Sequence, residues 1–477
     1  MWNIFDSHTY LTPKHSLTFQ QSLMKPSRLC TSNHFGYFSY AKRLVNRHSE
    51  NSKLSSLTNV TTLTYSTITG NNDKETIMNF KRMHCSGIRS SELKYAAVFK
   101  ACASFLALEE GRQIQVDCLK HGLDSDVYVG NTMIHFYGCC KKIIDARKVF
   151  DEMPYTSVVS WNTIISAYFR VSWFYESGEC FMKMRDVGIE PDETTFMVVL
   201  SVCAELGNLT FGKYVHAQMI EKGLGLTCRL GTALVNMYGK CGALNMASLV
   251  FDKMADRNVW TWNARIQGLA QHGLARHAIS LFEKMKDASI QPNHVTFLGV
   301  ICACSHAGYV EDGYRFFEEM KTVYGIKPHL THYGAMVDVL GRAGHLTEAY
   351  NFIVNMPIEP DPTVWRTLFS ACSVHSASDF DGVGEKVQKK LLELEPRWSG
   401  NLVMVANKYA EVCKWEDAAQ MRKSMRFKRL KKIAGESCIE VNGLTFRFLS
   451  GFDSQAPCVD IYLLLDGLCL NMKINNP

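Results

Sequence analysis

Residues 158–192 contain the pattern that decides the fold: VVSWNTIISAYFRVSWFYESGECFMKMRDVGIEPD. In the first half, apolar side chains recur every three or four residues, at Trp161, Ile164, Ile165 and Tyr168. A second stripe follows at Cys180, Phe181 and Met184. This spacing is typical of amphipathic helices. Gly188 and Pro191 are of the residue types that end helices and begin turns, so the stretch predicts two helices joined by a short turn.

The features of this stretch recur along the chain at a step of 101 residues. Trp161 and Asn162 return as Trp262 and Asn263, and the same step relates Met83, Met184 and Met285, Cys102, Cys203 and Cys304, and Gly111, Gly212 and Gly313. Such a repeat predicts stacked helical hairpins, because each hairpin must meet its neighbour in the same way to extend one core. Function is therefore expected on a repeated face of the molecule.

The 101-residue period divides into units of 35, 35 and 31 residues. We place the units at 92–126, 127–157, 158–192, 193–227, 228–258, 259–293, 294–329 and 330–361, after a truncated unit at 61–91. The array then spans 61–361, and a shortened turn accounts for the 31-residue units. Ala146, Ala247 and Ala349 occupy one position, where a small residue is expected to let two helices approach closely.

The first 56 residues differ from the rest of the chain in composition. They hold ten serines and seven lysines and arginines against two acids, so most of the formal net charge of +6 lies there. This composition predicts an organelle transit peptide in 1–56, and the alternative is a disordered leader that carries no address. We expect the mitochondrion as the compartment. The chloroplast stays as the alternative, because composition does not separate the two. The remaining chain is nearly neutral, which is weak for binding that depends on phosphate neutralisation alone.

Neither a catalytic site nor a metal site is indicated. The 17 cysteines are scattered, which predicts buried free thiols, and no Cys-x-x-Cys pair favours zinc. Gly207–Lys213, GNLTFGK, approaches a phosphate-binding loop, but Tyr214 replaces the required Ser/Thr, and the glycine recurs in other units as part of a turn. No nucleophile–base pair stands out. We therefore expect no enzyme and no cofactor. We also expect no membrane span, since no stretch approaches the ~20 apolar residues that one needs.

Hairpins of 35 residues with Trp-Asn-Thr near the start and Gly-Ile-Glu-Pro-Asp at the end, as in 158–192, resemble pentatricopeptide repeats. The 35/35/31 alternation is similar to the plant P-L-S subclass. The resemblance implies an all-α fold, a right-handed α-solenoid. Residues 362–396 resemble the first E motif of plant editing factors, 397–449 resemble the second, and 450–477 resemble the short E+ extension. A DYW cytidine-deaminase domain is not recognised.

One detail of the second E motif follows from the residues alone. Asn442-Gly443 lies between the alternating apolar residues Ile439 and Val441 on one side and Leu444 and Phe446 on the other. This pattern predicts a β-hairpin with a two-residue turn.

In pentatricopeptide repeats, the fifth and last residues of a unit contact one RNA base. The resemblance therefore implies four polar pairs: Asn131 with Ser157 for cytosine, Asn162 with Asp192 for uracil, Thr232 with Asn258 for adenine, and Asn263 with Asn293 for a pyrimidine, cytosine first. Amide and hydroxyl groups suit this task because they donate and accept hydrogen bonds. The alternative is that the asparagines only cap or support helices.

Other positions complete the expected footprint, 5′ x-x-C-U-x-A-Y-x-x 3′. The second residues Val159 and Trp260 are expected to pack against bases. Ala96, Met197 and Leu298 stand at the fifth position of L-type units and receive no base, and the pairs Gly334 with Asp361 and Ser66 with Ser91 depart from the usual combinations. A basic segment, 422–432, either contacts RNA phosphates or is a solvated helix end.

The resemblance implies a protein that binds single-stranded organellar RNA at sites of C-to-U editing. A DYW-type deaminase would then act in trans, and multiple organellar RNA-editing factor proteins would be further partners. Two alternatives stay open: an organellar RNA-binding factor for splicing, stability or translation, and a helical-repeat scaffold that binds only proteins.

Overall fold

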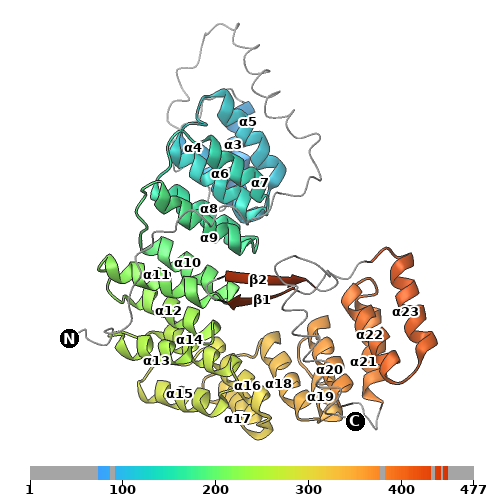
Figure 1. Cartoon of the computed structure of the whole chain (residues 1–477). Helices are drawn as coiled ribbons and strands as arrows, with labels where there is room; N and C mark the ends of the chain where they lie inside the picture. Colours follow the sequence, from blue (N-terminus) through green and yellow to red (C-terminus); the bar gives the residue numbers. More distant parts are fainter. Residues whose placement is uncertain (1–72, 86–91, 376–381, 431–435, 442–443, 450–477) are drawn as a thin grey trace.

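The computed structural model describes residues 73–85, 92–375, 382–430, 436–441 and 444–449, and in them helical hairpins stack into a curved α-solenoid (Figure 1). The chain runs along the arc from the first hairpins, drawn in blue, to the last, drawn in orange-red (Figure 1). The predicted leader 1–56 and tail 450–477 lie outside the described residues. So do 61–72 and 86–91 of the truncated first unit.

Each hairpin consists of a first and a second helix. The first helices are α4 Glu92–Phe105, α6 Val127–Cys139, α8 Val158–Arg170, α10 Glu193–Leu206, α12 Cys228–Lys240, α14 Val259–Gln271, α16 His294–Ala307, α18 Leu330–Arg342, α20 Pro362–Val374 and α22 Ser399–Glu411. The second helices are α5 Leu108–Lys120, α7 Ile143–Glu152, α9 Phe174–Asp186, α11 Leu209–Glu221, α13 Leu244–Lys253, α15 Ala275–Asp287, α17 Val310–Thr322, α19 Leu346–Val354, α21 Val383–Leu394 and α23 Trp415–Phe427. Helix α3, Asp73–Cys85, precedes them.

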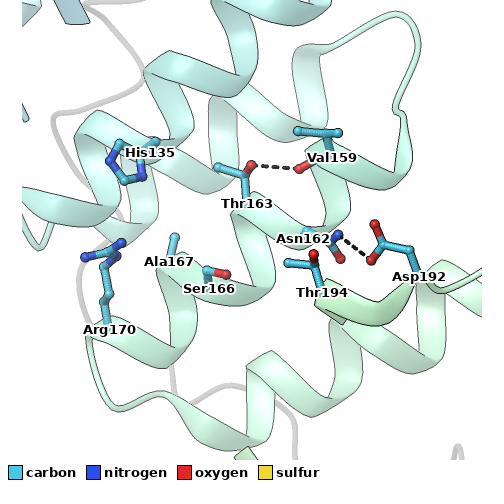
Figure 2. Close-up of a pocket in the computed structure, with 9 residues that line it drawn as sticks. All are labelled: His135, Val159, Asn162, Thr163, Ser166, Ala167, Arg170, Asp192 and Thr194. Carbon is cyan, nitrogen blue, oxygen red and sulfur yellow. Dashed lines mark hydrogen bonds between the residues drawn. The ribbon is translucent and has the colours of Figure 1, made fainter. Parts of the chain in front are cut away.

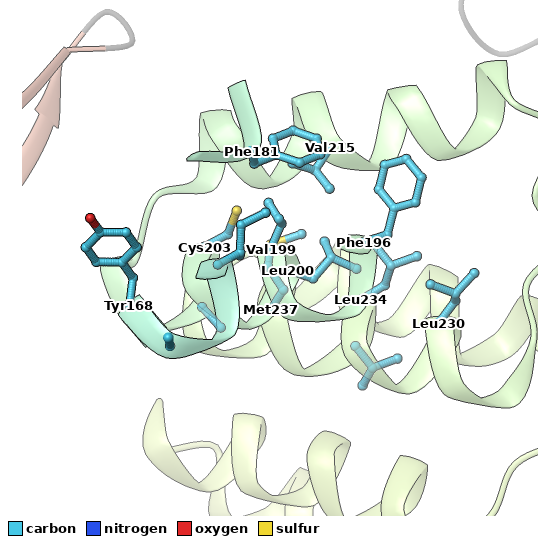
Figure 3. Close-up of a cluster of buried hydrophobic side chains, with 14 of the residues drawn as sticks. Tyr168, Phe181, Phe196, Val199, Leu200, Cys203, Val215, Leu230, Leu234 and Met237 are labelled. Carbon is cyan, nitrogen blue, oxygen red and sulfur yellow. The ribbon is translucent and has the colours of Figure 1, made fainter. Parts of the chain in front are cut away.

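The first helices form one layer, in which each packs against the first helices before and after it, and the second helices form the other layer. The core runs between the layers as two long clusters, one from Ile77 to Val339 and one from Val337 to Val405. Figure 3 shows part of the first cluster, where Phe181 of α9 meets Phe196 of α10 at a ring distance of 6.3 Å. The periodic apolar residues thus hold neighbouring units together as well as the two helices of each unit.

The recurring glycines allow neighbouring units to approach closely. A Cβ atom on Gly111 would lie 2.0 Å from the Phe136 ring, and one on Gly212 would lie 2.4 Å from the Met237 sulfur. The expectation of a turn at this glycine was wrong, because Gly212 lies inside α11. Within the segment Gly207–Lys213, Gly207 has a left-handed backbone conformation, with φ of 63°. The repeated glycine therefore serves helix packing.

The other repeated small residue has the expected environment. Ala146, Ala247 and Ala349 are fully buried in α7, α13 and α19. Cys102 and Cys304 are buried free thiols, and burial raises the pKa of each to about 12. These thiols stay protonated at neutral pH and act as small apolar residues of the core.

The solenoid is followed by two strands, β1 Glu436–Val441 and β2 Leu444–Leu449, which pair antiparallel with Val441 opposite Leu444. This pairing confirms the predicted hairpin. Along the described part of the chain, no helix is both long and apolar enough to cross a membrane.

Candidate nucleic-acid interface

The last residue of a unit caps the first helix of the next unit. Ser157, Asp192, Asn258 and Asn293 each accept a hydrogen bond from the backbone N–H of the third residue of α8, α10, α14 and α16. Ser, Asp and Asn are favoured at this position because their oxygens satisfy N–H groups that the helix leaves free. Capping therefore fixes these four candidate residues at the boundary between consecutive first helices.

Asn162 reaches across this boundary to the next cap. Its Nδ2 donates to Asp192 Oδ1 at 2.9 Å, and its Oδ1 accepts from the Thr195 hydroxyl at 2.6 Å. Asp192 Oδ1 also accepts from the Thr195 backbone N–H at 2.8 Å. Since an amide has two N–H donors and two acceptor lone pairs, one donor and one acceptor of Asn162 remain available.

Asp192 remains ionised at neutral pH. Burial alone would raise its pKa, but hydrogen bonds from the Thr195 backbone and from the Asn162 side chain hold the pKa below its usual value. The carboxylate therefore acts only as a hydrogen-bond acceptor.

These groups line a pocket of about 340 Å³ between the first helices (Figure 2). Val159 and Thr194, the second residues of two consecutive units, lie on its walls, and Asn162 and Asp192 lie together at one side. Val159 is 59% exposed, whereas Asn162 is 8% exposed. The pocket thus combines accessible walls with a largely buried polar group whose orientation is fixed.

Asn263 repeats the arrangement one period later. Its Nδ2 donates to Asn293 Oδ1 at 3.1 Å, and its Oδ1 accepts from the Thr296 hydroxyl at 2.6 Å. Asn293 Oδ1 also accepts from the backbone N–H groups of Val295 and Thr296, so its NH₂ group is turned away from the helix end. Asn263 is 3% exposed, and the second residue Trp260 is 57% exposed.

Thr232 and Asn258 are linked through a third residue. The Thr232 hydroxyl donates to the Cys228 carbonyl oxygen at 2.7 Å, and it lies 2.7 Å from the Thr261 hydroxyl. Since Thr232 has one hydroxyl proton, the proton between the two oxygens comes from Thr261. Thr232 is therefore held as an acceptor with one lone pair left.

Comparisons with known proteins identify the family of the chain. A model of the PPR repeat family matches residues 156–205 and 257–306, a model of the PPR repeat matches 131–155, 232–259 and 295–323, and an E motif model matches 380–440. The pentatricopeptide repeat-containing protein At2g36730 of Arabidopsis thaliana is 53% identical over 393 residues, which are 82% of this chain and 78% of that protein. The chain belongs to the pentatricopeptide repeat family.

Two further matches have lower sequence identity. The chloroplastic pentatricopeptide repeat-containing protein At1g11290 of the same plant is 38% identical over 84% of this chain, and this alignment spans 49% of its own length. Among solved structures, the pentatricopeptide repeat protein PPR10 in complex with an 18-nt psaJ RNA element is 18% identical, with a TM-score of 0.47 over 76% of this chain and 58% of that chain.

The repeat 127–157 of this pentatricopeptide repeat protein departs from the other three. Asn131 is 9% exposed, and its Oδ1 is buried without a hydrogen-bond partner. Ser157 caps α8, and its hydroxyl lies 3.2 Å from the Ser160 hydroxyl, which also accepts from the Ser157 backbone N–H. The structure thus gives no hydrogen bond between Asn131 and Ser157.

The other four repeats between residues 92 and 361 offer no polar side chain at the fifth position. Ala96 is buried, and Met197 and Leu298 are partly buried against the core. Gly334 has no side chain, although Asp361 caps α20 as the other caps do. These repeats therefore lack an amide or hydroxyl group at the position where the other four repeats carry one.

Sequence reasoning missed several residues at the interface. Thr195 and Thr296 were not singled out, although they stand 101 residues apart like the other repeated landmarks. His135 and Arg170 also line the Asn162 pocket, and no sequence pattern marked them. Burial, and to a smaller extent the charges of Arg170 and Lys100, lower the pKa of His135, so this ring is neutral at neutral pH.

The remaining basic segment lies at the end of the solenoid. Arg422, Lys423 and Arg426 are on α23, whose first turn carries Glu416 and Asp417. Acidic residues at the start and basic residues at the end stabilise this helix through its dipole. In the part of the chain that the structure describes, no group of three or more His, Cys, Asp and Glu residues is placed to hold a metal ion.

Proposed function

We propose that the chain is a sequence-specific single-stranded RNA-binding protein of an organelle and acts as a site-recognition factor for C-to-U RNA editing. The observation that carries the proposal is the pocket at Asn162 and Asp192, which has accessible walls and a fixed polar group. A base that enters between Val159 and Thr194 would expose its Watson–Crick edge to the side chains of Asn162 and Asp192. Single-stranded RNA is suited to this mode because its unstacked bases are free to insert.

The hydrogen-bonding pattern at Asn162 and Asp192 favours uracil. The second carboxylate oxygen of Asp192 accepts, which matches the N3–H donor of uracil. The free N–H of Asn162 donates, which matches a uracil carbonyl oxygen. Cytosine has an acceptor at N3, and it would place a lone pair against the ionised Asp192.

The opposite pattern holds at Asn263 and Asn293. The outward NH₂ group of Asn293 donates, which matches the N3 acceptor of cytosine, and the free lone pair of Asn263 accepts from the cytosine amino group. At Thr232 and Asn258, an acceptor hydroxyl beside an amide that can donate matches the N6 amino group and N1 of adenine. Asn131 and Ser157 present an amide and a hydroxyl, for which we propose cytosine.

The four base-contacting positions are too few to specify one RNA site by themselves. A good polar contact pair discriminates by about 1–3 kcal/mol, and four such positions select roughly one sequence in a few hundred. We therefore propose that multiple organellar RNA-editing factor proteins assist the L-type repeats of a P-L-S array. The 35/35/31 unit lengths and the ten-residue helices α7 and α13 support this subclass.

The E motif match at 380–440 supports the assignment to editing. We propose that a DYW-type deaminase is recruited in trans and acts on a cytidine 3′ of the last repeat. The composition of residues 1–56, and the names of relatives given as chloroplastic or chloroplastic/mitochondrial, support an organelle. We propose the mitochondrion, with the chloroplast as the alternative.

Sequencing organellar RNA from a loss-of-function plant tests this proposal. We expect at least one C-to-U site to lose editing, with the C-U-x-A-Y footprint 5′ of it. Intact editing with altered transcript ends or retained introns would assign the protein to RNA processing instead. The absence of any binding of the purified chain to single-stranded RNA with this footprint would favour a protein-only scaffold.

A further inference from the structure

In the repeats between residues 92 and 361, a buried hydroxyl follows each polar fifth residue. The relevant residue is the third of the next first helix, and we call its side-chain group the N3 hydroxyl. Polar fifth residues are followed by Ser160, Thr195, Thr261 and Thr296, for Asn131, Asn162, Thr232 and Asn263 respectively. Fifth residues without a polar group are followed by Val129, Leu230, His332 and Val364, for Ala96, Met197, Leu298 and Gly334 respectively. Helix capping alone does not account for this division, because Thr227 and Asp361 cap helices whose third residues are Leu230 and Val364.

The three threonines among these residues contact the fifth residue directly. Thr195 and Thr296 each donate to an asparagine Oδ1 at 2.6 Å, and Thr261 lies 2.7 Å from the Thr232 hydroxyl. All three threonines are fully buried, so they contact the preceding repeat and are screened from any RNA in the groove. Their effect on recognition would therefore act through the fifth residue.

The proton of the N3 hydroxyl is directed to the amide. Thr195 Oγ1 lies 2.6 Å from Asn162 Oδ1 and 2.8 Å from Asp192 Oδ1. Asp192 Oδ1 already accepts from the Thr195 backbone and from Asn162, so the amide oxygen is the nearer and less occupied acceptor. With Asp192 holding Nδ2 and Thr195 holding Oδ1, both ends of the amide are fixed.

We propose that Thr195 and Thr296 are specificity-determining positioning residues, which fix the orientation of the recognition amide that belongs to the preceding repeat. This inference rests on the proposed function. It assigns the selectivity of one nucleotide to three side chains from two repeats: the fifth residue, the cap and the N3 hydroxyl.

The repeat 127–157 is the natural exception. Ser160 supplies an N3 hydroxyl, but that hydroxyl bonds Ser157, and Asn131 Oδ1 stays buried without a partner. A serine side chain has more rotational freedom than a threonine, because threonine carries two heavy atoms on Cβ. The base selectivity of Asn131 should therefore be weaker than that of Asn162.

The test compares the binding of full-length protein to RNAs that carry U or C at the Asn162 position. Thr195→Val keeps the side-chain shape and removes the hydroxyl. We expect the ratio of the two Kd values to fall about three- to tenfold, the size of one hydrogen bond. Thr195→Ser should restore only part of the ratio, because the serine hydroxyl is less restricted than that of threonine. An unchanged ratio in Thr195→Val would overturn the inference.

Ser160→Ala is the matched control, since Ser160 and Thr195 both accept from the backbone N–H of the preceding cap. Ser160→Ala loses this capping bond and no bond to a recognition amide, so base preference at the Asn131 position should not change. An equal loss of preference in both variants would assign the effect to capping. If the wild-type protein bound U and C RNAs equally, the proposed function would fail first, and that outcome is distinct from a wild-type preference that Thr195→Val retains.

Discussion

Repeats 127–157 and 158–192 carry the same fifth residue in different surroundings. In the second, Asn162 is bonded at both ends, to Asp192 and to Thr195. In the first, the Asn131 oxygen is buried and has no partner. The sequence difference that separates them lies in the cap and in the helix that follows the cap. The orientation of the amide is therefore fixed by its neighbours, and the asparagine alone does not ensure it.

The largest expected effect comes from removing the Asn162 amide, and removal of the Asn131 amide is the comparison. Asn162→Ala should weaken binding to RNA with uracil at its position by about ten- to a hundredfold, because a fixed polar contact is lost. Asn131→Ala should cost only about threefold, the lower end of the range for one hydrogen bond. Fluorescence anisotropy with C-U-x-A-Y RNA measures both. Equal losses on every RNA sequence would contradict base recognition, and equal losses for the two variants would contradict the comparison.

The second effect concerns the cap. Asp192→Asn gives repeat 158–192 the same pair of residues as 259–293, with an NH₂ group in place of an outward acceptor. We expect the preference at this nucleotide to change from uracil to cytosine, while the melting temperature changes little because asparagine caps helices as well as aspartate does. Competition between U and C RNAs is the measurement. A retained uracil preference would show that the charge of Asp192 is not what selects the base.

A third change makes the weaker repeat more like the stronger one. Ser160→Thr restricts the side-chain rotamers and should direct the hydroxyl toward the Asn131 oxygen. Satisfying this buried acceptor should raise the free energy of unfolding by about 1 kcal/mol and increase selectivity at this nucleotide about threefold. Chemical denaturation and paired Kd values test the two parts. Lower stability without a gain in selectivity would mean that the hydroxyl cannot reach Asn131.

The smallest effect concerns pH. Because the pKa of Asp192 is lowered in the folded protein, its ionisation stabilises the fold above the unfolded-state pKa of about 3.9, and this contribution is lost as pH falls through the lower folded pKa. The unfolding free energy of the wild type relative to Asp192→Asn should therefore be constant above about pH 5 and decrease below about pH 4. Ser157→Asn in the neighbouring repeat has no titrating group at the cap and should show no such dependence. A constant difference down to pH 3 for Asp192→Asn would contradict the lowered pKa.

Much of the fold could be predicted from the sequence because packing imposes the same residue types at each step of 101. The apolar stripes, the buried alanines and the β-hairpin all follow from local rules, and the helices and strands are where those rules predict them. Gly212 was misassigned to a turn, because a glycine that prevents a collision with Met237 has the same appearance in sequence as one that turns the chain.

The candidate site was less predictable. The pairs Asn162 with Asp192 and Asn263 with Asn293 came from the family resemblance, and each is joined by a hydrogen bond in the structure. Thr195 was missed because it belongs to the next repeat and its partner is 33 residues away. The isolation of Asn131 depends on which way a serine hydroxyl turns, and no sequence pattern records that. Base selectivity at all four pairs stays a prediction.

The shared helix cap has a consequence for protein engineering. A chimera cut before Glu193, where α10 begins, would separate the Asn162 amide from the Thr195 hydroxyl that holds its oxygen. The module that we propose for uracil is instead the segment 159–195, which crosses a repeat boundary and keeps Val159, Asn162, Asp192 and Thr195 on one piece. Grafts of this segment should transfer base preference, whereas grafts of the whole repeat 158–192 would carry the fifth residue and the cap without the N3 hydroxyl.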